Sequence, residues 1–216
     1  MKKFLVFIFV LFVIACSNDN DTLGRNDKWW QDRHQQIVEK IKNEKFDIAF
    51  LGDSITHFWE QEGIDSWIEI SEKYKIINEG IAGDKTGNLL WRLQNGALAN
   101  AKITIIMIGT NNLWHGNNTP KKTANKIKTI VKYINKNTKT KIILLSIIPS
   151  TDENLNKKFN ELNEYLKEIK NVDYLDISKL YQDTDGNVAE INYKDIVHLS
   201  VDGYKKEKEE LLKFIK

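Results

Sequence analysis

The fold is decided by a short apolar run that ends in small and polar residues, FDIAFLGDSIT at residues 46–56. The apolar part spans 46–51 and is closed by Gly52, a pattern typical of a buried strand. Ser54 follows at once, where we expect the chain to turn from the strand into a helix. A serine at such a turn projects its oxygen over the edge of the sheet, close to the first unpaired N–H groups of the new helix.

The rest of the chain repeats this alternation of strand and helix. The predicted strands are 46–51, 75–78, 103–108, 141–148 and 172–177. The predicted helices are 29–41, 86–99, 119–137, 154–169 and 200–215. Such alternation predicts an α/β fold with right-handed crossovers and a parallel sheet covered on both faces. Functional sites in these sheets form beyond the carboxyl ends of the strands, so we expect reactive residues just after strands.

Length and composition exclude several classes of protein. The chain has 216 residues, enough for one domain, and carries 32 Lys and Arg against 30 Asp and Glu. Lys2 and Lys3 lie in a segment that we expect to be removed, which leaves 30 of each sign. A near-neutral mature protein is not expected to bind nucleic acid in general, because such binders carry a basic excess. The single cysteine excludes an internal disulfide framework and a multi-cysteine metal site.

The N-terminus has the pattern of a targeting signal. A positive start is followed by an apolar run of twelve residues at 4–15, which is too short to span a bilayer and is typical of a signal peptide. The run ends in VIAC, which resembles a bacterial lipobox with Cys16 as the lipidated residue. We therefore predict a signal peptide at 1–15, lipidated Cys16 and a polar tether at 16–27, and the folded domain at 28–216. This organisation implies a lipid-anchored protein of the cell envelope, on the periplasmic face or the cell surface; alternatives are secretion after cleavage nearby and an uncleaved anchor.

A nucleophilic Ser54 needs a base, and the candidates for that base are His57, His115 and His198. His57 follows Ser54 on the same short turn, and His115 lies in the loop after the third strand, while His34 is expected to be exposed on the first helix. His198 alone has a carboxylate three residues before it, Asp195, at a spacing that puts both on one side of a helical turn. The carboxylate can then accept from Nδ1–H and leave Nε2 free as the base.

Two further loops offer hydrogen-bond donors. The loop after the second strand reads NEGIAGDKT at 78–86. It does not fit a phosphate loop, because Asp84 interrupts the Gly-Lys-Thr run and would repel phosphate. The other interpretation is a turn that exposes the Gly83 N–H as an oxyanion donor. The third strand is followed by GTNN at 109–112, where the amide of Asn111 can supply another donor.

These four blocks, in this order, resemble the SGNH (GDSL) hydrolase superfamily, close to its platelet-activating-factor-acetylhydrolase-like and carbohydrate-esterase branches. The resemblance covers roughly residues 46 to 204 and implies a flavodoxin-like three-layer α/β/α sandwich with a five-stranded parallel sheet. The sequence departs from the family pattern at two positions. Ile55 replaces the usual leucine, and Asn112 stands where the family often has aspartate, so the role of Asn112 stays open.

The resemblance implies a role for each candidate residue. Ser54 would be the nucleophile, His198 the base and Asp195 its orienting acid. The oxyanion hole would consist of the N–H groups of Ser54 and Gly83 and the side-chain amide of Asn111. No metal or organic cofactor is implied.

We therefore expect a serine esterase that hydrolyses short acyl esters, O-acetyl groups on carbohydrate above all, through an acyl-enzyme. The alternatives are a lysophospholipase or thioesterase, and, in another class, a non-catalytic carbohydrate-binding lipoprotein. Trp59, Trp91 and Trp114 are candidates for substrate contact, or else core residues. The eight lysines of 120–141 form either a patch for an anionic partner or, as we favour, a solvated helix face. The oligomeric state is not predicted.

Overall fold

The computed structural model describes residues 24–116 and 118–215, so the predicted signal peptide and Cys16 lie outside the described residues. Its centre is a sheet of five strands, all parallel, in the order β2-β1-β3-β4-β5. The strands are β1 (Ile48–Gly52), β2 (Ile76–Asn78), β3 (Ile103–Met107), β4 (Lys141–Leu145) and β5 (Asp173–Leu175). This confirms the predicted α/β fold class.

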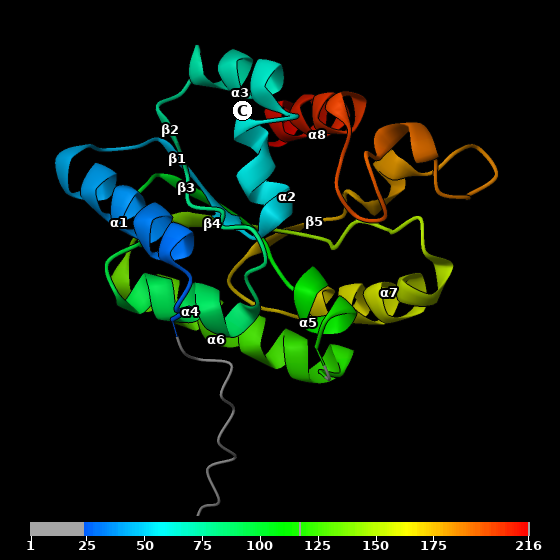
Figure 1. Cartoon of the computed structure of the whole chain (residues 1–216), viewed down its shortest axis with the longest axis horizontal. Helices are drawn as coiled ribbons and strands as arrows, with labels where there is room; N and C mark the ends of the chain where they lie inside the picture. The colour runs from blue at the N-terminus through cyan, green and yellow to red at the C-terminus, as the bar shows by residue number, and fades with distance from the viewer. Residues whose placement is uncertain (1–23, 117, 216) are drawn as a thin grey trace, which may run out of the picture.

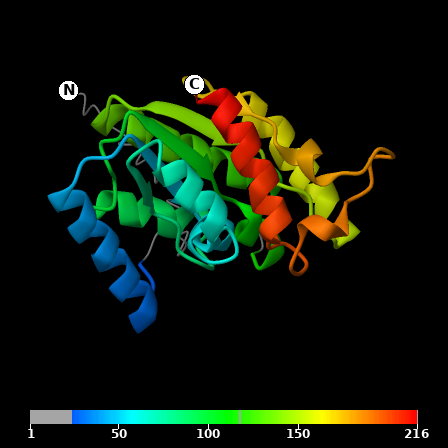
Figure 2. The ribbon, with the colours of Figure 1, turned by 90° about the horizontal axis from the view of Figure 1, so that it is seen from above.

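Helices cover both faces of the sheet (Figure 1). The longer ones are α1 (Lys28–Asn43), α3 (Ile64–Ser71), α4 (Thr86–Gln94), α6 (Pro120–Asn137), α7 (Glu153–Lys167) and α8 (Val201–Phe214). The short ones are α2 (Ser54–His57), η2 (Phe58–Glu60), α5 (Thr110–Trp114), η3 (Ser178–Tyr181) and η4 (Glu190–Asn192). One layer holds α4, α6 and α7, and the other holds α3 and α8, which lie side by side (Figure 2). The layers and the sheet between them form the predicted three-layer sandwich.

The register of the central strands decides where the site lies. Strand β1 is buried along its whole length, and its pairing with β3 runs from Ile48 opposite Ile103 to Gly52 opposite Met107. A Cβ atom at Gly52 would lie 2.4 Å from the Met107 carbonyl oxygen and 2.0 Å from Thr56 Oγ1, so only glycine fits there. The residues that follow β1 and β3 therefore leave the sheet at the same edge.

Several element ends differ from the prediction for identifiable reasons. The predicted strand 141–148 ends at Leu145, because the backbone of Ile147 hydrogen-bonds to a side chain instead of a neighbouring strand. Its N–H donates to Asn163 Oδ1 at 2.7 Å, and its carbonyl oxygen accepts from Asn163 Nδ2 at 2.8 Å. The predicted helix 86–99 ends at Gln94, just before Gly96, whose φ of +97° is incompatible with a continued helix. Helix α3 was not predicted.

Within residues 24–116 and 118–215, no helix combines the length and the apolar character that crossing a bilayer requires.

Tyr204 ties α8 to the turn that carries Ser54, and its removal gives a test of the packing. Its hydroxyl donates to the Ile55 carbonyl oxygen at 2.7 Å, and its ring packs edge-on against Trp59 at 5.0 Å. Tyr204→Phe keeps the ring but removes a buried donor, so we expect the free energy of unfolding to fall by about 1–3 kcal/mol in urea denaturation. Tyr165→Phe, at a side chain 36% exposed on α7, is the control and should change it by less than about 0.5 kcal/mol. Equal stability of the two variants would contradict the assigned role of Tyr204.

Candidate active site

Ser54, His198 and Asp195 are in direct contact, although 144 residues separate the serine from the histidine. His198 Nε2 lies 2.8 Å from Ser54 Oγ. On the other side of the ring, Nδ1 lies 2.8 Å from Asp195 Oδ2 and 3.0 Å from Oδ1. Assigning the ring proton to Nδ1, where the carboxylate accepts it, leaves the Nε2 lone pair facing the serine hydroxyl. The structure therefore brings together the three residues that the sequence singled out for this purpose.

Ser54 is held at the junction of β1 and α2. It is the first residue of α2, and the buried carboxylate of Asp53 caps this helix by accepting from the Ile55 N–H at 3.1 Å. Asp53 therefore has a structural role at the start of α2. Burial raises its pKa to about 7.

The loop that carries Asp195 and His198 is fastened to the segment that connects β4 to α7. The Ile196 carbonyl oxygen accepts from Ser150 Oγ at 2.9 Å and from the Thr151 N–H at 3.0 Å. The Tyr193 hydroxyl donates to the Pro149 carbonyl oxygen at 2.6 Å, and Lys194 forms an ion pair with Glu62, in the connection between η2 and α3. These contacts fix the direction from which the histidine approaches the serine.

Backbone donors keep Asp195 ionised as well as oriented. Partial burial on its own would raise its pKa, but the hydrogen bonds from the backbone and ring of His198 and from the Val197 N–H outweigh burial and lower it. An Asp195 that is ionised at neutral pH stabilises a positive charge on His198 when the ring takes up a proton.

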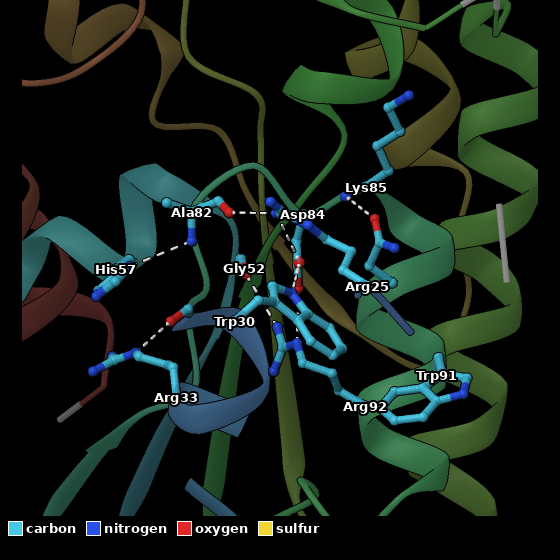
Figure 3. Close-up of polar contacts among 12 residues, drawn as sticks. Arg25, Trp30, Arg33, Gly52, His57, Ala82, Asp84, Lys85, Trp91 and Arg92 are labelled. Atoms are coloured by element: carbon cyan, nitrogen blue, oxygen red, sulfur yellow. Dashed lines mark hydrogen bonds and ion pairs between the residues drawn. The ribbon is translucent and has the colours of Figure 1, made fainter. Parts of the chain in front are cut away.

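The loop at 78–85 lies beside the same turn, and Figure 3 shows its contacts. The Ala82 N–H donates to Nδ1 of His57, on α2, at 3.3 Å. The Asp84 carbonyl oxygen accepts from Asn111 Nδ2 at 3.1 Å. The loop is thus attached both to the helix of Ser54 and to Asn111. Gly83 has a φ of +78°, which favours glycine.

A buried carboxylate anchors the base of this loop. Asp84 is 0% exposed, and its two oxygens accept from Trp30 Nε1 and from Arg92 Nε, each at 2.7 Å (Figure 3). Arg92 is equally buried and also donates to the Gly52 carbonyl oxygen, at 3.4 Å. Asp84 thereby joins α1, α4 and the end of β1. The sequence analysis used Asp84 only to exclude a phosphate loop and did not predict its ion pair. The presence of Arg92, eight residues further along the chain, was the sequence feature that could have indicated a buried ion pair.

The other histidines have other roles. His57 accepts from Ala82 rather than serving Ser54, and burial together with the charges of Arg33 and Arg92 lowers its pKa to about 4, so it stays neutral and able to accept at neutral pH. His115 stacks on Trp114 with ring centroids 4.0 Å apart. The expectation that His34 is exposed is wrong. His34 is buried and stacks on Trp30 at 5.7 Å, because the face of α1 that carries both residues packs against Trp91 of α4.

Two of the three candidate tryptophans belong to the packing of the domain. Trp59 is 1% exposed and lies among Phe50, Trp67 and Tyr204, so no substrate can contact it, and that assignment is wrong. Trp91 packs against the rings of Trp30 and His34, 5.6 and 5.3 Å away, which also makes it a contact between helices. Trp114 closes α5, the helix of Asn111, and its contact with substrate stays a prediction.

The structure answers the question left open for Asn112. This side chain is fully buried; its Oδ1 accepts from the Thr86 N–H at 2.9 Å and its Nδ2 donates to Thr86 Oγ1 at 3.0 Å. Asn112 therefore joins α5 to the first turn of α4, directly after the loop of Gly83.

The Asn112 contact gives a testable pair of variants. Asn112→Ala leaves a buried N–H without its acceptor, so we expect a loss of about 1–3 kcal/mol in the free energy of unfolding. Asn112→Asp, measured at acidic pH where the buried carboxyl is neutral, keeps an acceptor for the Thr86 N–H and a donor for its hydroxyl oxygen, and should retain most of the stability. Thermal and urea denaturation of both variants provide the measurement. If the aspartate variant proved as unstable as the alanine variant, the assigned hydrogen bonds would be wrong.

Among the described residues, no three or more His, Cys, Asp and Glu side chains are grouped as metal ligands.

A serine, a histidine and an aspartate hydrogen-bonded in this order form the catalytic triad of serine hydrolases, which recurs on several unrelated folds. The chain belongs to the GDSL-like lipase/acylhydrolase family, which matches residues 50–206, and this membership places it among the carboxylic ester hydrolases.

Individual relatives agree with this membership. The chain is 34% identical over 191 residues to platelet-activating factor acetylhydrolase IB subunit alpha2 of Rattus norvegicus, covering 84% of this chain and 81% of that one. It is 29% identical to subunit alpha1 from the same organism, covering 83% and 79%. A GDSL-like lipase from Bacteroides thetaiotaomicron has the same fold, with a TM-score of 0.71 at 18% identity over 84% of this chain and 96% of that one.

Proposed function

We propose that the protein is a serine esterase that removes short acyl groups, acetyl above all, through an acyl-enzyme intermediate. The observation that carries this proposal is the continuous contact from Ser54 Oγ through the His198 ring to the Asp195 carboxylate. A hydroxyl that faces the free nitrogen of an oriented imidazole is the arrangement that nucleophilic acyl transfer needs.

In the acylation half, Ser54 Oγ forms a bond to the ester carbonyl carbon while its proton passes to His198 Nε2. The carbonyl oxygen becomes an oxyanion, and the positive charge on the ring is balanced by Asp195. When the carbonyl re-forms, the bond to the leaving alkoxide breaks, and His198 returns the proton to that oxygen. The products of this half are the free alcohol and an acyl ester on Ser54.

In the deacylation half, water replaces the alcohol. His198 Nε2 takes a proton from the water, whose oxygen attacks the acyl carbon and again produces an oxyanion. Collapse of this intermediate breaks the bond to Ser54 Oγ, which recovers its proton from His198. The carboxylic acid leaves and the resting site is restored.

The oxyanion would be stabilised by the Ser54 N–H at the start of α2, the Gly83 N–H and the amide of Asn111. Asn111 Nδ2 carries two hydrogens, and its bond to the Asp84 carbonyl oxygen uses one of them and fixes the plane of the amide. Donors that are oriented before charge develops supply a large part of catalysis in such sites.

We assign the leaving group to carbohydrate. An open groove of about 360 Å³ adjoins the triad at Asp195, although neither Ser54 nor His198 lines it. Apart from Ile196, its lining is polar and suits sugar hydroxyls: Thr151, Glu190, Tyr193, Lys194 and Asp195. A lipid leaving group is the second candidate, favoured by the relatives that are named platelet-activating factor acetylhydrolases. Those same names favour acetyl as the acyl group.

We further propose that residues 1–15 direct export and that Cys16 is lipidated, which would hold the esterase in the cell envelope. The carboxyl end of the apolar run, VIAC, supports this. Lipid labelling of the full chain should be lost in Cys16→Ala, and labelling that persists would contradict the proposal.

Covalent labelling separates an esterase from a carbohydrate-binding protein that only retains the fold. A fluorophosphonate should form a stoichiometric adduct on Ser54, located by mass spectrometry of peptides. Ser54→Ala should remove both the adduct and the hydrolysis of p-nitrophenyl acetate, because no other atom of the site replaces the hydroxyl. A native protein that stays unlabelled would favour the binding protein.

Asn111→Ala should lower turnover of p-nitrophenyl acetate about 10²–10³-fold, because one oxyanion donor is lost. The loss should lie in kcat rather than in KM, since the donor acts mainly when charge develops. Unchanged turnover would remove Asn111 from the scheme.

A substrate panel decides between the two leaving groups. Acetylated oligosaccharides, lysophospholipids, acetylated ether phospholipids and acyl thioesters should be compared by kcat/KM in the same buffer. The carbohydrate assignment expects the acetylated oligosaccharides to be the best substrates and activity on p-nitrophenyl esters to fall with chain length. Turnover of the lipids or thioesters alone would contradict it.

A further inference from the structure

We propose that Arg25 is a positioning residue of the oxyanion site, whose guanidinium orients and polarises the peptide between Ala82 and Gly83. The inference rests on the proposed function, because it concerns the Gly83 N–H as an oxyanion donor. Arg25 lies before α1, in the stretch assigned from the sequence to the tether, and no motif pointed to it.

Arg25 contacts the loop directly. Its Nη1 donates to the Ala82 carbonyl oxygen at 2.8 Å, across 57 residues of sequence (Figure 3). A Cβ atom placed on Gly83 would lie only 2.9 Å from the same Nη1. The guanidinium therefore lies against the peptide unit that contains the proposed donor.

The planar geometry of the peptide explains how the contact of Arg25 with the Ala82 carbonyl oxygen affects the Gly83 N–H. The Ala82 carbonyl and the Gly83 N–H belong to one rigid planar unit and, in a trans peptide, point in opposite directions. The described residues contain no cis peptide bond, so a donor that holds the carbonyl oxygen also sets the direction of the N–H. A cationic donor on the oxygen further polarises the amide, which makes the N–H a stronger donor to an oxyanion.

Arg25 is itself held in place from several sides. Its Nε donates to Asp27 Oδ2 at 2.9 Å, and its Cζ lies 5.2 Å from the centroid of the Trp29 ring. Nη1 also lies 4.0 Å from Asp84 Oδ1, the buried carboxylate at the base of the loop. With its side chain only 25% exposed, the guanidinium has a defined position before substrate arrives.

Arg33 provides a matched comparison on the same loop. Its Nε donates to the Gly80 carbonyl oxygen at 3.2 Å (Figure 3). Its Nη2 forms an ion pair with Glu60 at 2.7 Å. The peptide that it holds presents the Ile81 N–H, which already donates to the Gly52 carbonyl oxygen at 3.3 Å. Arg33 thus supports the loop without acting on the proposed oxyanion donor.

The test uses a trifluoromethyl ketone with a short acyl side and, for comparison, the secondary alcohol of the same skeleton. Ser54 Oγ adds to the ketone carbon, its proton passes to His198, and the ketone oxygen becomes an oxyanion without loss of a leaving group. Ketone affinity therefore reports oxyanion stabilisation, whereas the alcohol reports ordinary binding. Both are measured on the full chain for the native protein, Arg25→Met, Arg25→Lys and Arg33→Met.

We expect Arg25→Met to lower kcat of p-nitrophenyl acetate and affinity for the ketone in parallel, by about 10-fold, with KM and alcohol affinity nearly unchanged. This is smaller than the about 10²–10³-fold loss for a deleted donor, since the N–H itself remains. Arg25→Lys restores a cationic donor and should recover part of both, and it provides a folded comparison if the methionine variant is unstable. Arg33→Met should lose stability through its ion pair while its ketone-to-alcohol affinity ratio stays native.

Ketone affinity that is unchanged in Arg25→Met, or lost equally in Arg33→Met, would overturn the role of Arg25 and leave the esterase intact. Arg25→Lys that binds the ketone no better than Arg25→Met would also contradict it. If the native protein itself formed no adduct with the ketone or with the fluorophosphonate, the proposed function would fail first, and the role of Arg25 with it.

Discussion

The arrangement of the site depends on one buried carboxylate, that of Asp84. An isolated charge in a protein interior is strongly unfavourable, so its two short hydrogen bonds to Trp30 and Arg92 are a condition of its burial. Because these partners come from α1 and α4, and Arg92 also reaches the end of β1, a single ion pair fixes where the loop at 78–85 leaves the sheet. This ion pair therefore also sets the position of the Gly83 peptide and of the Asp84 carbonyl oxygen that contacts Asn111.

A second constraint separates the two histidines near Ser54. His57 is adjacent in sequence, yet its Nδ1 is occupied by the Ala82 N–H, and burial keeps the ring neutral. His198 comes from far along the chain but carries Asp195 on its other nitrogen. His198 is therefore placed to act as the base, and His57 supports the loop. The two rings differ in the group that contacts Nδ1, which is a carboxylate in His198 and a backbone N–H in His57.

Much of the fold and the triad could be predicted because they depend on local patterns. Buried parallel strands are apolar on both faces, so β3 was evident from 103–108. The pairing of Asp195 with His198 was evident from their spacing of three residues, although the segment forms bends rather than the expected helical turn. Helix α3 was missed because Ile64 and Ile68 stay 42% and 48% exposed, which blurs its apolar face. The contact of Arg25 with Ala82 could not be foreseen, because 57 residues separate them in the sequence, and the sequence left Trp59 open between substrate contact and the core.

The two outer strands of the sheet, β2 and β5, have three residues each, whereas the inner strands have five. Unpaired edges are templates for joining one molecule to the next, and short, charged edges offer little to copy. Lys75 precedes β2, and Asp173 begins β5 in an ion pair with Lys141. Crowding many copies together should therefore not drive fibril growth by strand addition at either flank.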